Sequence, residues 1–146
     1  MQLQHLVYVS RAVSPFGPVA LKQLAKHCSK KNAPLGITGL LLYSGGHFMQ
    51  LLEGPESVVG GLFDLIHRDP RHAAVRRLLS KPVSGRLFPQ WNMGLLNLDS
   101  TASSDLRGLT TALRGALPDR TRPAGTEGAL ALLREFRQQL PAPSVV

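Results

Sequence analysis

Cysteine and long apolar runs are scarce in this chain. The single cysteine, Cys28, excludes an intramolecular disulfide framework and a structural zinc site built on several thiolates. No apolar run approaches the roughly 18 residues needed to cross a bilayer, and the first residues lack a positively charged leader before an apolar stretch. We therefore expect no membrane segment and a cytoplasmic location.

Acidic residues are absent before Glu53, although the net charge of the whole chain is +8. A field of this sign attracts anions such as nucleic acid, an acidic partner protein or a phosphorylated cofactor. The basic residues are dispersed, however, with only two adjacent pairs, Lys30-Lys31 and Arg76-Arg77, and no aromatic-rich RNA-binding signature among them. A solvated surface is the simplest interpretation, and we do not expect nucleic-acid binding.

Motifs of common enzyme classes are also missing. The sequence has no dinucleotide-binding glycine fingerprint, no phosphate-binding glycine loop, no zinc-protease helix motif and no serine nucleophile elbow. The histidines are scattered without ligand-like helical spacing, and Glu53 and Glu56 straddle a strand end and a helix start, which argues against a paired-carboxylate site. We expect a protein that is not an enzyme.

Hydrophobic periodicity predicts the order β-α-β-β-α-β followed by one more strand. The chain of 146 residues, 43% of them hydrophobic, is long enough for one compact domain with a small appendage. This order is the ferredoxin-like α+β plan, an antiparallel-rich sheet with two helices on one face. The expected elements are a strand over 3–10, a helix over 18–32, a hairpin of strands 36–43 and 47–53, a helix over 55–69, and strands within 73–82 and 91–96.

Composition changes beyond Asp99. Two short amphipathic segments follow, separated by the linker-like residues 118–125. Segments this short are not stable alone, so we expect them to pack on the other face of the sheet or on a partner. We divide the chain into a domain over 1–97 and a helical extension over 98–146. The apolar residues that mark the two segments are Leu106, Leu109, Leu113 and Leu117, and Leu130, Leu133, Phe136 and Leu140.

Two polar residues stand where the strand pattern expects burial. Tyr8 lies between Val7 and Val9, and Gln50 interrupts the otherwise apolar run 48–52. The first and third strands are neighbours in the ferredoxin-like plan, so both side chains are expected in the layer beneath the two helices. Because a buried amide needs partners, patterning alone favours a Tyr8–Gln50 hydrogen bond closed within the core.

Seven short stretches in the first 95 residues form a combined pattern. They are Leu6–Ser10, Asn32, Gly36–Tyr43, Phe48–Gly54, Asp69–His72, Arg86–Phe88 and Trp91–Gly94. In this order and spacing they resemble the BLUF domain, which senses blue light with a flavin. The resemblance implies a noncovalently bound flavin between the two helices, FAD in the first place, with FMN and riboflavin as alternatives.

The resemblance also implies photochemical roles for four residues. Tyr8 would donate an electron and then a proton to the excited flavin. Gln50 would relay the proton and then rotate or tautomerise, because a primary amide carries a donor and an acceptor whose exchange rewires the network. Trp91 and Met93 would carry the structural output from the last strand, and the sequence leaves open which of them lies nearer the flavin.

Five further positions are implied to bind the cofactor. Asn32 and Arg71 would bind the carbonyls on the pyrimidine edge of the flavin ring, and Ile37 and Ile66 would sandwich the ring. Lys31, with its neighbour Lys30, would pair with a flavin phosphate, although solvated lysines are the alternative interpretation.

The expected output is a signal to another molecule. The residues after the domain hold only two short helices, so we expect the signal to pass to a partner protein through the C-terminal region or through rearrangement of a homo-oligomer. Two alternatives remain open. One is an acyl-phosphate hydrolase on the same scaffold, in which Arg71 or Arg11 holds phosphate with an asparagine. The other is a basic module that binds nucleic acid or an acidic partner and has lost its flavin.

Overall fold

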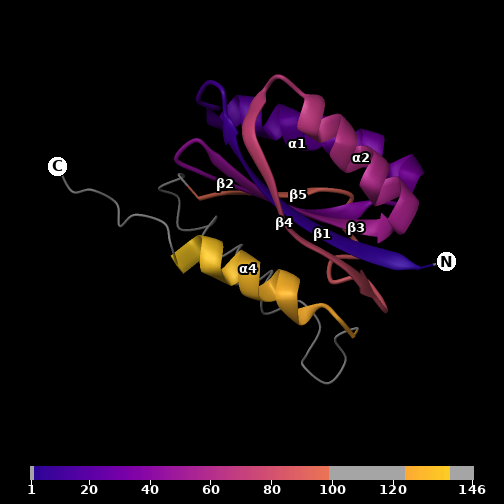
Figure 1. Ribbon diagram of the computed structural model, residues 1–146. Helices are drawn as coiled ribbons and strands as arrows, with labels where there is room; N and C mark the ends of the chain where they lie inside the picture. The colour runs from indigo at the N-terminus through magenta and orange to yellow at the C-terminus, as the bar shows by residue number, and fades with distance from the viewer. Residues whose placement is uncertain (1, 99–123, 139–146) are drawn as a thin grey trace.

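A five-stranded sheet with two helices on one face forms the first part of the structure (Figure 1). The coordinates are a computed structural model, which describes residues 2–98 and 124–138. The predicted ferredoxin-like α+β plan is confirmed. The elements are β1 (Leu3–Ala12), α1 (Pro18–Asn32), the short 3-10 helix η1 (Ala33–Leu35), β2 (Thr38–Ser44), β3 (His47–Pro55), α2 (Glu56–Arg68), β4 (His72–Val83), β5 (Gly94–Asn97) and α4 (Glu127–Gln138).

The strands lie in the order β4-β1-β3-β2-β5. The pairs β4-β1, β1-β3 and β3-β2 are antiparallel, whereas β5 runs parallel to β2. As predicted, the first and third strands are neighbours, and their register places Tyr8 directly opposite Gln50. Residues that face each other across two strands point to the same side of the sheet, so these two side chains share one layer.

The predicted hairpin joins β2 to β3 through Gly45 and Gly46. Both glycines have positive φ, 53° and 81°. A two-residue turn with positive φ at both central positions matches the right-handed twist of the strands that it joins, and glycine adopts this conformation without the cost of a side chain. The hairpin fixes the register of β3, and with it the position of Gln50.

Both sheet-covering helices follow the periodicity of the sequence. Helix α1 buries Leu21, Leu24 and Ala25, while Lys22 and Lys26 are exposed. Helix α2 starts with Glu56 in its first turn and ends before Asp69-Pro70, as predicted. Within the described parts of the chain, no helix combines the length and apolar character needed to cross a membrane.

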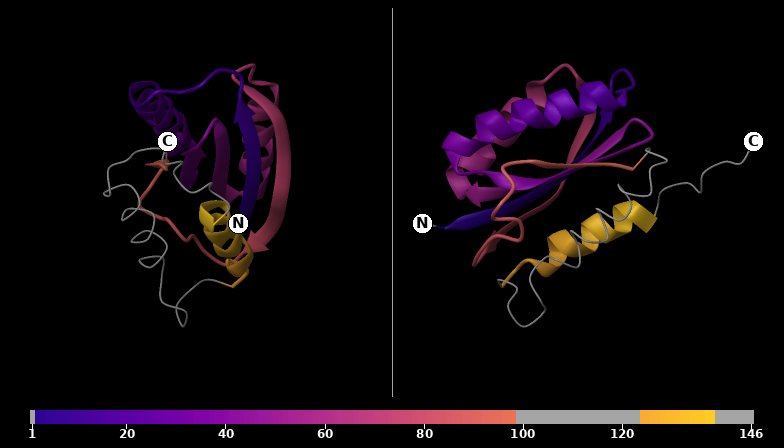
Figure 2. Two further views of the ribbon diagram at one scale, coloured as in Figure 1. Left: turned by 90° about the vertical axis from the view of Figure 1, so that its left-hand side faces the viewer. Right: turned by 180° about the vertical axis from the view of Figure 1, so that it is seen from behind.

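The sheet separates two hydrophobic cores. Alternate strand residues face α1 and α2, and the residues between them, such as Val7, Leu40 and Leu51, face α4. Helix α4 buries Ala129, Leu130 and Leu133 against this second face (Figures 1 and 2). Of the two predicted locations for the last amphipathic segment, the other face of the sheet and a partner, the structure shows the first. The segment marked by Leu106 to Leu117, and Leu140, lie outside the described residues.

The last strand is shorter than predicted. We expected it within 91–96, but β5 begins at Gly94, so Trp91 and Met93 precede the strand. Gly39 still donates its backbone N–H to the Trp91 carbonyl at 2.9 Å. The carbonyl of Ile37, however, accepts from the side-chain amide of Asn92 at 3.0 Å. The Asn92 side chain therefore donates the hydrogen bond that a backbone N–H would donate to Ile37 in a regular pair of strands.

Candidate functional site

A buried chain of hydrogen bonds links β1, β3 and the segment before β5. The Tyr8 hydroxyl donates to Oε1 of Gln50, and Nε2 of Gln50 donates to the Met93 sulfur at 3.2 Å. Tyr8, Gln50 and Met93 are 1%, 4% and 7% exposed. The predicted Tyr8–Gln50 contact is present, and the amide is oriented by a phenol on one side and a thioether on the other.

Tyr8 is a neutral phenol in this environment. Burial raises the pKa of its hydroxyl far above the ordinary value, and the nearby Cys28 and Asp69 raise it further. The ring stacks on Phe63 of α2, with centroids 5.6 Å apart and planes at 18°. The hydroxyl hydrogen is therefore retained and directed at a single acceptor.

The structure shows which of the two predicted output residues lies inward. Met93 is buried against Gln50, whereas Trp91 is 38% exposed. The Trp91 ring lies parallel to Phe88, with centroids 5.5 Å apart. A change at Gln50 would thus reach Met93 directly and Trp91 only through the chain between them.

Asn32, the last residue of α1, binds the segment that precedes β5. It is buried, and its Nδ2 donates to the Asn92 carbonyl at 2.9 Å. The Asn92 side chain bonds in turn to the carbonyl of Ile37, whose backbone N–H donates to the Asn32 carbonyl at 3.1 Å. Sequence reasoning assigned no role to Asn92. Its only signal was an amide placed between the two predicted output residues.

Charged groups gather at one end of α1. Burial raises the pKa of the Cys28 thiol, Arg71 and Lys31 oppose that rise, and Asp69 adds to it. The Arg71 guanidinium binds both carboxylate oxygens of Asp69, at 2.6 Å in the shortest contact, and these bonds lower the pKa of Asp69 to about 2. Two positive groups, Arg71 and Lys31, and one negative group, Asp69, thus act on the space beside Cys28.

The layer between the sheet and the helices suits a flat aromatic cofactor. Ile66 and Phe63 of α2 and Cys28 of α1 pack on the core but are only partly buried. Covering such apolar surface stabilises a complex by about 25 cal/mol per Å². Ile37, by contrast, is already fully buried. A flavin beside Tyr8 and Gln50 would meet apolar walls and the polar groups of Asn32 and Arg71, so these residues fit the group.

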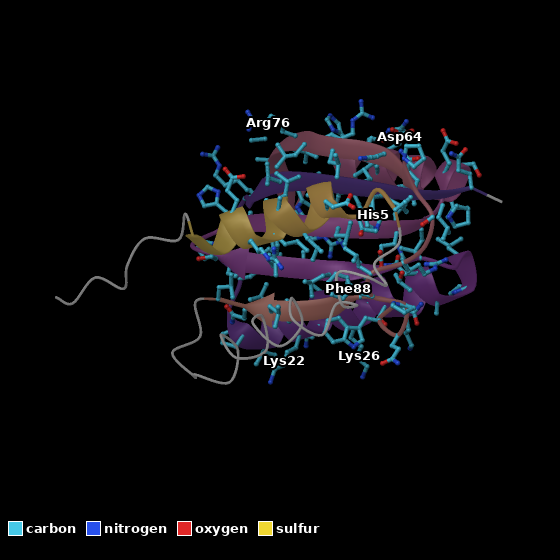
Figure 3. The ribbon with its side chains drawn as sticks, turned by 90° about the horizontal axis from the view of Figure 1, so that it is seen from below. His5, Lys22, Lys26, Asp64, Arg76 and Phe88 are labelled. Atoms are coloured by element: carbon cyan, nitrogen blue, oxygen red, sulfur yellow. The ribbon has the colours of Figure 1, made fainter. Side chains whose placement is uncertain are left out.

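Sequence reasoning missed a second polar cluster, on the face of the sheet that α4 covers. His5, which is labelled in Figure 3, and Glu53 are register partners, and their side chains meet at 2.6 Å. Glu53 also accepts from Thr38 and from the backbone N–H groups of Leu87 and Phe88, at 3.1, 2.5 and 2.9 Å. The carboxylate therefore anchors the chain that leads to Trp91 and Met93.

Glu53 makes stability depend on pH. Burial alone would raise its pKa, but the bonds from His5, Leu87 and Phe88 lower that pKa below the ordinary value of 4.5. Because the folded pKa is depressed, the contribution of Glu53 is full above about pH 4.5 and is lost as the pH falls through the folded pKa. Glu53→Gln should cost about 2 kcal/mol at neutral pH and less in acid.

Urea unfolding over a pH series measures this difference. Exposed Glu56 is the matched control, and we expect Glu56→Gln to unfold with the acid dependence of the parent protein. An unchanged acid dependence in the Glu53→Gln protein would contradict the assignment.

Comparison with known families identifies the domain. The family model for BLUF, sensors of blue-light using FAD, matches residues 3–94. The chain belongs to the BLUF family. The matched part of the chain is therefore a sensor module, and the cofactor of its family is FAD, as the resemblance in the sequence implied.

Related BLUF proteins differ in what accompanies the domain. The photoactivated adenylate cyclase subunit beta of Euglena longa is 37% identical over 92 residues, which are 62% of this chain but only 11% of that protein. The solved structure of the BlrP1 BLUF domain covers 100% of this chain and 99% of its own, with 30% identity and a TM-score of 0.79. The structure of BlrB, a BLUF protein in its dark state, covers 95% of this chain and 98% of its own, with 36% identity and a TM-score of 0.67. None of these matches supports the acyl-phosphate hydrolase or the nucleic-acid module.

Proposed function

We propose that this chain senses blue light through FAD held between α1 and α2. Tyr8, Gln50 and Met93 would convert the absorbed light into a change of hydrogen bonding. The observation that carries this proposal is the buried chain from the Tyr8 hydroxyl through the Gln50 amide to the Met93 sulfur. FAD, when bound, supplies blue-light absorption and accepts an electron and a proton.

Tyr8 is the donor in this scheme. A phenol is oxidisable, and loss of an electron makes its proton strongly acidic. Gln50 Oε1 already accepts the hydrogen bond along which that proton leaves. Return of the electron and proton to Tyr8 restores the phenol, so the residues finish the cycle in their starting covalent state.

The amide of Gln50 can change its hydrogen bonds by rotating, because its two ends are chemically different. Nε2 donates to the Met93 sulfur, and a thioether sulfur accepts hydrogen bonds but donates none. If the amide rotates, Oε1 faces that sulfur and the bond is lost. Met93 is then released, and the segment that carries Trp91 is free to shift.

Five residues hold the cofactor in this proposal. Asn32 and Arg71 bind the ring carbonyls, Ile37 and Ile66 pack on the ring, and Lys31 pairs with phosphate. The combined effect of Arg71 and Lys31 on the Cys28 thiol supports a location for anionic groups there.

The extension over 98–146 would pass the signal to a partner protein or to a second copy of the chain. Packing of α4 on the far face of the sheet from the cofactor layer supports this division at residue 97. The adenylate cyclase of the Euglena longa relative illustrates the kind of effector that a BLUF domain accompanies.

An absorption spectrum before and after blue light tests the function. Protein purified from a flavin-replete host should be yellow, and illumination should shift the flavin band to longer wavelength and reverse in the dark. Met93→Leu should retain the shift but recover at a different rate, because it removes only the sulfur that accepts from Gln50. A colourless protein, or a flavin spectrum that light does not shift, contradicts the proposal.

A further inference from the structure

A cleft separates α2 from β4 on the helix-covered face of the sheet. It consists of two adjoining hollows, of about 540 and 410 Å³, which share Leu6, Gly60 and Arg77. Neither hollow is lined by Gln50 or Tyr8, so the cleft lies beside the cofactor layer, with Phe63 between them. Phe63 and Val75 give the larger hollow an apolar interior, and Gln4 and Ser80 line the smaller one.

The cleft opens beside an edge strand. Among the described strands, β4 pairs only with β1, so the other side of this 12-residue strand has no ladder (Figure 2). An unpaired strand edge presents backbone N–H and C=O groups to any extended chain that lies along it. Peptide recognition by strand addition combines such an edge with pockets for alternate side chains.

The formally charged side chains of β4 are all basic. The strand carries Arg76, Arg77 and Lys81 and no acidic residue. The two arginine side chains make no hydrogen bond or ion pair with any described residue. Figure 3 shows Arg76 at the edge of the sheet, with Asp64 on α2. Asp64 lines the helix side of the cleft, so acidic groups of a ligand fit only on the β4 side.

A second copy of this chain is a poor occupant of the edge. Antiparallel pairing of two β4 strands would bring their basic side chains together, and like charges opposite each other destabilise a sheet. An acidic strand would instead form charge-assisted bonds with both guanidinium groups.

Room for a side chain exists on the α2 side. A Cβ added at Gly60 would meet no atom within 4 Å, and the same is true of its neighbour Gly61. Gly60 lines both hollows, whereas Gly61 lines neither. A larger residue at position 60 would therefore fill the cleft, and one at position 61 would not.

We propose that an acidic, extended segment of a partner protein adds to β4 as a sixth strand and inserts alternate side chains into the cleft. The site is coupled to the centre of the sheet, since Arg77, Tyr8 and Gln50 form one cross-strand row. Phe63 stacks on Tyr8 and also lines the cleft. Control of this binding by light rests on the proposed function, but binding in the dark does not.

Amide chemical shifts of the full, FAD-loaded chain test the docking site. The probe is a capped peptide of valine and glutamate whose order gives each face of the extended strand at least one glutamate, and its control carries lysine in place of glutamate. In the dark, we expect the acidic peptide to shift the amides of the non-proline residues within 72–83 and of Gly60, and the basic peptide to shift neither. Arg76→Glu with Arg77→Glu should weaken binding at least about tenfold.

Matched variants separate the site from the general positive field. Lys22→Glu with Lys26→Glu changes the charge equally on α1, at the opposite edge of the molecule (Figure 3), and should weaken binding much less. Gly60→Leu should block binding, and Gly61→Leu should not. Equal weakening by both charge variants, or no shift at β4, overturns the inference. Comparable binding of a DNA duplex at β4 overturns it in favour of a nucleic-acid surface.

Light is applied last. The affinity for the acidic peptide should change on illumination, and this change should disappear in the Tyr8→Phe protein. An intact red shift without dark binding overturns only the docking site, and dark binding without a red shift overturns only the proposed photochemistry. Dark binding and a red shift with no change in affinity overturn the coupling between them.

Discussion

Replacement of Tyr8 by phenylalanine is expected to abolish the light-induced red shift while FAD stays bound. The variant keeps the ring that stacks on Phe63 but removes the oxidisable hydroxyl and the hydrogen bond to Gln50. It leaves a buried amide oxygen without its donor, which should cost about 1–3 kcal/mol of unfolding free energy. Difference spectra recorded before and after illumination measure the photochemical loss, and urea unfolding measures the loss of stability.

The second tyrosine of the chain provides the control. Tyr43 lies on the same face of the sheet and is equally buried, but its hydroxyl accepts from the backbone N–H of Phe16 at 3.1 Å. Tyr43→Phe should therefore lose some stability and keep the red shift. A parent-like red shift in the Tyr8→Phe protein would show that Tyr8 is not the donor, and so would a loss of the shift in the Tyr43→Phe protein alone.

Gly39→Ala is expected to cause the largest loss of stability. A Cβ at this position would lie 1.9 Å from the Leu51 carbonyl oxygen and 3.0 Å from its carbonyl carbon. Both atoms belong to the backbone of β3, so no side chain can move aside to relieve the clash. The strands β2 and β3 would have to separate, at a cost of about 4 kcal/mol or more. The whole free energy of unfolding of a typical domain is only about 5–15 kcal/mol.

Gly46→Ala separates this steric effect from the effect of backbone conformation. Both glycines have positive φ, 157° at Gly39 and 81° at Gly46, but a Cβ at Gly46 would meet no atom within 4 Å. Only the left-handed backbone conformation then disfavours alanine, which should lower the free energy of unfolding by about 1–2 kcal/mol. Urea midpoints for both variants provide the comparison. Equal losses would mean that backbone conformation, and not the approach of β3, requires glycine at position 39.

The local pattern of the sequence predicted most of the fold. The helical period placed α1 and α2, the Gly45-Gly46 turn placed the hairpin, and strand alternation placed Tyr8 and Gln50 in one layer. The helices and the hairpin depend on near neighbours in the chain, which is why they can be read from the sequence. The shared layer of Tyr8 and Gln50 also required the strand order of the ferredoxin-like plan. The start of β5 could not be predicted in this way, because it depends on the bond between the Asn92 side chain and Ile37, a contact made across the fold.

Long-range contacts also explain what was missed at the sites. His5 resembles a solvent-facing strand residue, and Glu53 stands at a predicted strand end. Their pairing follows from the register of β1 with β3 and from the burial of both side chains on the face of the sheet that α4 covers. The inward position of Met93 likewise depends on where Gln50 directs its amide. The predicted roles of Asn32, Ile37, Ile66, Arg71 and Lys31 in cofactor binding stay predictions until a flavin complex is measured.

One strand holds both ends of the segment between Leu87 and Met93, from opposite sides of the sheet. Glu53 binds its first residues on the α4 side, and Gln50 binds Met93 on the helix side. If light releases only the Gln50 end, the Glu53 end remains as a pivot. The segment would then swing about a fixed point instead of detaching, so a small rotation of one amide would become a directed movement of the exposed Trp91 ring.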